Sequence, residues 1–136
     1  KKLQFSQAIA IVLFVICICF LYATTLFTRS PSGIRQFRCL LRVDWKLFMA
    51  GVQSEIDQVT LNIILFFPFG FLWDVIRKNK SNIWEIVLIG TVLSLSVEIM
   101  QYFSTRGVFD IEDLITNVIG MIIGGVVIKI LYILFR

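Results

Sequence analysis

Four long apolar stretches constrain this chain more than any other feature of its sequence. They cover residues 5–27, 59–76, 83–103 and 114–135. A helix rises about 1.5 Å per residue, so stretches of this length cross most or all of the roughly 30 Å hydrocarbon core of a bilayer. Only 16% of the residues are charged, against about a quarter in soluble domains. The sequence therefore predicts an all-α fold, a four-helix transmembrane bundle that forms a single membrane domain over residues 1–136.

The loops between these stretches favour a topology with both termini in the cytoplasm. The short loop 77–82 is dense in basic residues, with Arg77, Lys78 and Lys80, and Lys129 lies toward the same face. The two sides of the membrane carry nearly equal numbers of basic residues, so the positive-inside rule gives only a weak preference. We expect a multi-pass protein of the bacterial cell membrane, with the long loop 28–58 and the loop 104–113 outside.

The long first loop carries a basic face and an apolar face at helical spacing. Asp44 interrupts the apolar face, but the pattern is otherwise typical of an amphipathic helix that lies in the membrane interface. Either its cations bind anionic lipid headgroups or phosphates, or the segment simply covers the bundle. The second alternative is slightly favoured, because each interfacial cation contributes only about 1 kcal/mol. The candidate headgroup ligands are Arg35, Arg38, Arg42 and Lys46.

Polar side chains gather at one end of the predicted bundle, opposite the termini. A carboxylate or carboxamide within a membrane span is costly unless it is paired or faces a cavity, so it indicates a functional site by default. Spacing places these groups within roughly 8 Å of the ends of their helices, in the outer leaflet rather than at the midplane. The candidate ligand-binding residues are Asn62, Glu98, Gln101, Arg106, Asp110, Asp113 and Asn117.

Several of these residues also have purely structural interpretations. Asp110 can be an N-cap with Asp113 at the third helical position, a capping-box-like pair. The carboxamides can be interhelical hydrogen-bonding groups, each contributing about 0.6 kcal/mol. For Glu98 the functional interpretation is favoured, because a carboxylate at that depth is a poor packing element. Thr91, Ser94, Glu98 and Gln101 follow one helical face, and Gly120-x-x-x-Gly124 allows another helix to approach closely.

Composition excludes several classes of protein. The chain has no His, which excludes Ser-His-Asp and Cys-His enzymes and removes the commonest metal ligand. Its three cysteines, Cys17, Cys19 and Cys39, form no Cys-x-x-Cys pair and fit small apolar core residues. The net charge of +4 comes without a basic-aromatic pattern, so we expect no nucleic-acid partner. We also expect no cofactor and no resident metal.

Three ordered motifs resemble the VanZ-like family of bacterial membrane proteins. They are an Asn before Phe-x-Pro-x-Gly at 62–70, a Glu-x-x-Gln at 98–101, and an Asp-x-x-Asp-x-x-x-Asn-x-x-Gly at 110–120. The resemblance covers about the C-terminal three-fifths of the chain. It implies a four-helix integral membrane protein associated with resistance to teicoplanin-type lipoglycopeptides. The family's frequent Asn-Leu-x-Pro-Phe segment is missing from the first loop, so ligand preference in that loop is not carried over.

The residues are compatible with two main functions. The leading hypothesis is a module that engages a lipoglycopeptide or a lipid-linked cell-wall precursor at the outer leaflet, next to membrane lipid. The alternative is an intramembrane enzyme acting on such a precursor, with Glu98 as general acid or base and with Asp110 and Asp113 holding a divalent metal or orienting water. A transporter ranks third, since polar groups near the midplane and a repeat are missing. A membrane-protein partner is also compatible with the apolar helix faces.

Overall fold

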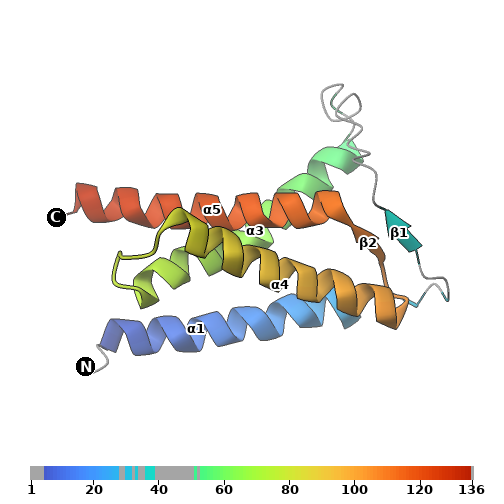
Figure 1. The fold of residues 1–136 in the computed structure, drawn as a ribbon, viewed down its shortest axis with the longest axis horizontal. Helices are drawn as coiled ribbons and strands as arrows, with labels where there is room; N and C mark the ends of the chain where they lie inside the picture. The colour runs from blue at the N-terminus through green and yellow to red at the C-terminus, as the bar shows by residue number, and fades with distance from the viewer. Residues whose placement is uncertain are drawn as a thin grey trace.

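The computed structural model is a bundle of long helices, and it describes residues 5–27, 30, 31, 33, 36–38, 51 and 53–135. Four helices are long and apolar enough to cross a membrane, which confirms the predicted transmembrane bundle. Both ends of the chain lie at one end of it (Figure 1). Within the described residues the helices are α1 (Phe5–Tyr22), continued by the π-helical turn η1 (Ala23–Phe27), then α3 (Gln53–Ile76), α4 (Ile83–Ser104) and α5 (Ile111–Leu134).

Two helices begin earlier than their apolar stretches. α3 begins at Gln53 rather than at residue 59, and α5 begins at Ile111 rather than at residue 114. Hydropathy marks the part of a helix that fits the hydrocarbon, whereas a helix can continue through polar residues whose side chains find partners. Pro68 lies inside α3 and does not end it, as expected where neighbouring helices pack around the helix.

Glycines set the closest contact in the bundle, between α3 and α5. A Cβ atom built on Gly124 would lie 2.0 Å from the carbonyl oxygen of Phe67, and one on Gly70 would lie 1.8 Å from that of Met121. Both positions therefore require glycine. The Gly120-x-x-x-Gly124 motif does admit a neighbouring helix, and that helix is α3, since Gly120 faces the backbone of Ile63. Gly90 of α4 packs against the side chain of Met121 on α5.

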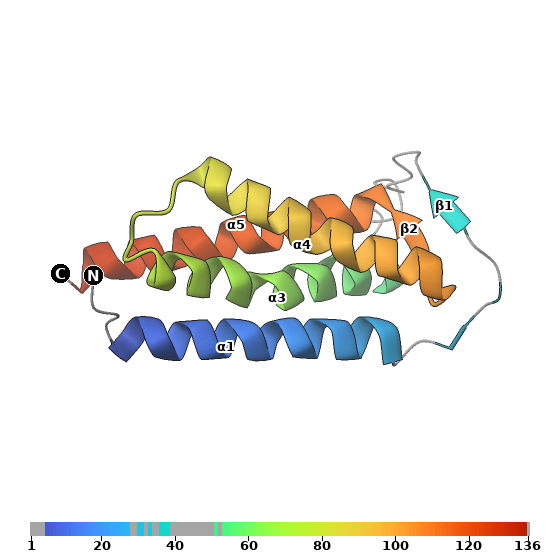
Figure 2. The ribbon, with the colours of Figure 1, turned by 60° about the horizontal axis from the view of Figure 1, so that its bottom comes forward.

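The apolar core lies between these helices and α1. Phe66, Phe69 and Met121 are at its centre, at most 1% exposed. α1 packs against α3, with Phe14 edge-on to Phe69 at a ring-centroid distance of 5.3 Å. Figure 2 shows α1 running beside α3 along the bundle. Most other side chains of α1 are exposed, as expected of a helix that faces lipid on much of its surface.

Two short strands close the end of the bundle opposite the termini. β1 (Gln36–Arg38) pairs in parallel with β2 (Val108–Asp110), with Phe37 opposite Phe109. The two rings stack at 4.7 Å. Within the segment expected to be an amphipathic helix, residues 36–38 are thus extended, because pairing with β2 satisfies their backbone groups. The remainder of that segment, including Arg35, Arg42 and Lys46, lies outside the described residues, as does the side chain of Arg38.

Candidate functional site

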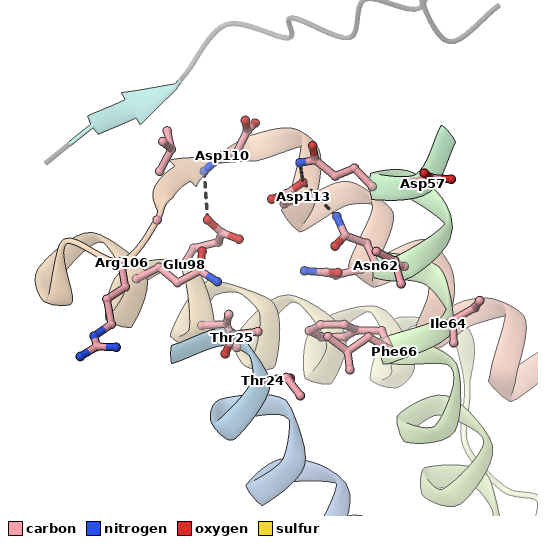
Figure 3. A pocket seen from close by; sticks show the side chains of 18 of the residues that line it. Thr24, Thr25, Asp57, Asn62, Ile64, Phe66, Glu98, Arg106, Asp110 and Asp113 are labelled. Atoms are coloured by element: carbon pink, nitrogen blue, oxygen red, sulfur yellow. Dashed lines mark hydrogen bonds between the residues drawn. The ribbon is translucent and has the colours of Figure 1, made fainter. Parts of the chain in front are cut away.

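A cavity of about 1010 Å³ opens at the strand end of the bundle. Its lining comes from α1 and η1, from α3 between Asp57 and Phe66, from the first turns of α5, from the last turns of α4, and from the α4–β2 connection and β2. Figure 3 shows these side chains converging from the helices around it. All seven candidate ligand-binding residues line the cavity: Asn62, Glu98, Gln101, Arg106, Asp110, Asp113 and Asn117.

Glu98 is fixed by the start of α5. The Glu98 side chain is 2% exposed, and its Oε2 accepts a hydrogen bond of 3.0 Å from the backbone N–H of Asp110. Asp110 is the N-cap of α5, and its own Oδ1 accepts from the N–H of Glu112. In a capping box, a residue of the same helix takes the N-cap N–H. Here a carboxylate of α4 takes it instead, so Glu98 ties the end of α4 to the start of α5.

Asp113, the residue expected to complete the capping box, turns toward α3. Its Oδ1 accepts hydrogen bonds from Gln58 Nε2 at 2.8 Å and from Asn62 Nδ2 at 2.9 Å. Asn62 also donates to Thr116 Oγ1 at 3.0 Å. The interhelical role expected of this carboxamide is therefore present, and these bonds support the polar first turns of both helices.

Two carboxamides of the cavity each have a buried oxygen without a donor. Asn117 donates from Nδ2 to Ser94 Oγ at 2.9 Å, which joins α5 to α4. Its Oδ1, and Oε1 of Gln101, have no hydrogen-bond partner among the described residues. Gln101 is 3% exposed and Asn117 is 4% exposed. An unsatisfied buried acceptor costs about 1–3 kcal/mol, and both oxygens are themselves buried, so water or a ligand in the cavity does not contact them directly.

Arg106 does not project toward the buried carboxylate. Its Nη1 donates to the carbonyl oxygen of Leu26 at 2.9 Å, which links the α4–β2 connection to η1. The guanidinium points away from Glu98 in Figure 3. In the turn before it, Thr105 adopts a left-handed conformation with φ of 56° and closes α4 through its backbone N–H. Arg106 therefore borders the cavity but anchors the end of α1.

The cavity has components that the sequence did not indicate. Thr24 and Thr25 line it from η1, and their hydroxyls donate to carbonyl oxygens one turn earlier, a pattern that bends helices. Asp57 and Gln58 line it from α3. Gln58 precedes Asn62 by four residues, so helical spacing alone could have found it. The threonines carry no comparable signal, because hydroxyls are common in membrane helices.

The four basic residues assigned to lipid headgroups stay a prediction. Arg35, Arg42 and Lys46 lie outside the described residues, and only the backbone of Arg38 is described, as the end of β1. The pairing of Arg38 with Asp110 in the strand register places this part of the first loop beside the cavity. Among the described residues, no three His, Cys, Asp or Glu side chains cluster as they would to hold a metal ion.

A second polar cluster, which the sequence did not indicate, lies at the end near the termini. Asp74 is fully buried, at 0% exposure, and lies 3.1 Å from Lys129 Nζ. Ser81 donates to the same carboxylate oxygen, and Lys129 also donates to the carbonyl oxygen of Ser81 at 2.8 Å. Lys129 thus lies toward the face expected from the sequence. There it joins α5 to α3 and to the start of α4.

Most of the chain matches a known protein family. The sequence model of the VanZ/LLP1 family matches residues 8–133. The chain is 40% identical to Protein VanZ of Enterococcus faecium over 63 residues. This matched segment covers 46% of the chain and 38% of that relative. The chain thus covers well under two thirds of the relative's length. No solved structure matches the chain.

Proposed function

The chain belongs to the VanZ/LLP1 family, and from this membership and the cavity at the strand end we propose that it engages an amphipathic ligand at the outer leaflet. The ligand is a lipid-anchored molecule or a lipoglycopeptide, and its engagement confers resistance to teicoplanin-type antibiotics. The protein resides in a bacterial cell membrane with both termini in the cytoplasm. That orientation places the cavity outside and the exposed Arg77, Lys78 and Lys80 inside, as the positive-inside rule favours.

One observation supports binding above all: the cavity has a polar floor and an apolar wall. Glu98, Gln101 and Asn117 are polar and buried, whereas Phe20, Leu61 and Ile64 line the same cavity and are 60% to 64% exposed. In a membrane, exposed apolar side chains face lipid. A headgroup can therefore lie on the floor while its chain stays in the bilayer, which suits an acylated antibiotic and not a soluble one.

The alternative is an enzyme that acts on a lipid-linked cell-wall precursor through acidic residues. Glu98 and Asp110 line the cavity together, as a general acid or base would require. However, Glu98 Oε2, Asp110 Oδ1 and Asp113 Oδ1 each accept hydrogen bonds from the protein. These oxygens have structural partners, so binding is the better supported of the two functions.

Antibiotic sensitivity tests the proposal directly. Cells making the wild-type protein should tolerate more teicoplanin than cells without it, with vancomycin tolerance unchanged, because vancomycin has no acyl tail. Glu98→Gln should abolish the protection at matched membrane levels. The control is Glu85→Gln, the same substitution in the ion pair that Glu85 forms with Arg77 outside the cavity. Equal protection against both drugs, or full protection by Glu98→Gln, would contradict the proposal.

A further inference from the structure

Asp113 is a carboxylate that no cation of the described residues pairs with. Its Oδ1 accepts hydrogen bonds from the amides of Gln58 and Asn62. Its other oxygen, Oδ2, accepts no hydrogen bond and forms no ion pair within the described part of the chain. The side chain is half-buried and lines the cavity. A charge partly removed from water is costly unless it is paired, so Asp113 favours a ligand that brings a cation.

Gln101 borders the same cavity from the facing helix. The hydrogen bond of 2.9 Å from Asn117 Nδ2 to Ser94 Oγ joins α5 to α4. From this bond toward the strand end, Asp113 lies about one turn further along α5 and Gln101 about two turns further along α4. Figure 3 shows Asp113 extending from α5 toward the same space as Glu98 of α4. A ligand held between the two helices can therefore contact both walls.

The amide of Gln101 offers a hydrogen-bond donor at its wall. The residue is 3% exposed and its Oε1 is buried. Its Nε2 has no acceptor among the residues that the structure describes, and it opens to the cavity. An amide nitrogen only donates. A ligand at Gln101 must therefore bring an acceptor, such as a phosphate or carbonyl oxygen.

The open atoms of Asp113 and Gln101 together select a headgroup that carries both a cation and an acceptor. An ammonium group adds N–H donors to its charge, and a charge-assisted hydrogen bond is stronger than a neutral one. A choline group carries the same charge but has no N–H. An anionic headgroup without a cation would bring an acceptor to Gln101 and a like charge to Asp113. An amine next to a phosphate or carbonyl oxygen satisfies both positions.

The apolar wall sets a further requirement. Phe20 of α1 and Leu61 and Ile64 of α3 form the lipid-facing side of the cavity. An acyl chain on these side chains would continue directly into the bilayer. The volume of about 1010 Å³ is at the upper end of the range for small-molecule sites, so it accommodates a headgroup together with the first part of a chain.

We propose that the cavity binds an acylated primary amine, whose ammonium group donates to Asp113 Oδ2 while a neighbouring oxygen accepts from Gln101 Nε2. The acyl chain lies along the apolar wall. This inference rests on the proposed function and names the headgroup chemistry of its ligand. An amine and an acyl chain can come from an ethanolamine phospholipid or from a lipoglycopeptide, and the experiment separates these two sources.

Native mass spectrometry of the purified full chain in a polyoxyethylene detergent tests the amine. Three phospholipids with the same acyl chains are titrated: phosphatidylethanolamine, phosphatidylcholine and phosphatidylglycerol. Phosphatidylethanolamine should bind about tenfold more tightly than phosphatidylcholine, because choline cannot donate to the carboxylate of Asp113. Phosphatidylglycerol should bind most weakly of the three, because it brings a negative charge and no cation.

Asp113→Asn tests the contact with the ammonium group. The substitution keeps the shape of the side chain and an oxygen for Gln58 and Asn62, and it removes the charge. It should reduce the preference for phosphatidylethanolamine over phosphatidylcholine about fivefold. The control is Glu112→Gln, which removes a carboxylate from the same turn of α5 but from outside the lining of the cavity. It should leave the preference unchanged.

Gln101→Met tests the contact with the acceptor. It keeps the length of the side chain and removes the amide, so both zwitterionic lipids should bind about threefold more weakly while their ratio stays the same. If Asp113→Asn loses helicity by circular dichroism, a change in the ligand replaces it. Phosphatidyl-N,N-dimethylethanolamine keeps one N–H, and its affinity for the wild type should be closer to that of phosphatidylethanolamine than to that of phosphatidylcholine.

Competition with teicoplanin identifies the source of the amine. Displacement of bound phosphatidylethanolamine by teicoplanin would show that the antibiotic occupies the amine site. Binding of the lipid without displacement would assign the site to an ethanolamine phospholipid.

Four results would overturn the inference, and they separate it from the proposed function. Equal binding of phosphatidylethanolamine and phosphatidylcholine would remove the amine and leave an amphiphile-binding cavity. Tightest binding of phosphatidylglycerol would assign the site to an anionic headgroup. An equal loss of preference in Asp113→Asn and Glu112→Gln would replace the direct contact by a general effect of charge. Failure of every lipid and of teicoplanin to bind would overturn both the inference and the proposed function.

Discussion

Each end of the bundle buries a carboxylate, and the surroundings of the two differ. Near the termini, Asp74 has a cation within 3.1 Å and a hydroxyl donor, and it does not line the large cavity. At the strand end, Glu98 accepts a backbone N–H from Asp110 and borders about 1010 Å³ of open space. Burial alone therefore does not identify a functional carboxylate. The space beside the carboxylate separates the structural ion pair of Asp74 from the candidate site at Glu98.

The largest effect should come from removing the cation near the termini. Lys129→Met leaves Asp74 buried without its charged partner, and breaking a buried pair in this way costs about 3–5 kcal/mol. The free energy of unfolding in detergent micelles, measured by denaturant titration, should fall by that amount. The double variant Asp74→Leu with Lys129→Met should recover most of it, because no unpaired charge remains. A loss below about 1 kcal/mol for Lys129→Met would mean that Asp74 is not held as a structural pair.

The next largest effect concerns the glycine contact between the two ends. Gly124→Ala places a Cβ 2.0 Å from the carbonyl oxygen of Phe67, and a backbone atom cannot move aside as a side-chain terminus can. We expect a loss of about 1–3 kcal/mol as α3 and α5 separate. Ile123→Ala, on the exposed side of α5, is the control and should unfold close to the wild type. If Gly124→Ala is neutral, α3 and α5 do not pack this closely.

The contrast between the ends also shows how much could be predicted from sequence. Hydropathy locates the four spans, and the position of the polar residues at one end of those spans and in the loop beside them predicts the seven candidate residues, all of which line the cavity, because both signals are local. The Asp74–Lys129 pair joins residues far apart in the chain, and Asp74 lies close enough to the end of its span to suggest an ordinary interfacial charge. The parallel pairing of β1 with β2 is equally non-local. The helical spacing of basic residues in the first loop therefore predicts a helix, whereas residues 36–38 are extended.

The capping-box interpretation of Asp110 and Asp113 meets a related limit. Asp110 is the N-cap that this interpretation expects, but its N–H is taken by Glu98 from another helix rather than by Asp113. Asp113 is then available to the amides of Gln58 and Asn62. Local motifs predict which groups need partners, and tertiary packing decides which groups supply them.

A smaller effect is expected at the amide contact between α3 and α5. Asn62→Leu removes the hydrogen bonds to Asp113 Oδ1 and Thr116 Oγ1. Interhelical hydrogen bonds in membranes contribute about 0.6 kcal/mol on average and up to about 1.7, so unfolding in micelles should be easier by an amount in this range. Gln58 still donates to Asp113, which limits the loss. A cost as large as that of Lys129→Met would show that the strand end is held as tightly as the end near the termini.

The smallest effect on stability should come from Glu98→Gln, and it distinguishes the two ends most sharply. The amide oxygen of Gln can still accept the Asp110 N–H, so the free energy of unfolding should fall by no more than about 1 kcal/mol, the difference between a charged and a neutral acceptor. Asp74→Asn, the equivalent substitution near the termini, removes a charge paired with Lys129 and should cost about 1.5–3 kcal/mol. Teicoplanin protection should show the opposite order, lost in Glu98→Gln and retained in Asp74→Asn at matched membrane levels. If Glu98→Gln instead destabilises the bundle as much as Asp74→Asn does, Glu98 is a structural carboxylate and the two ends are alike.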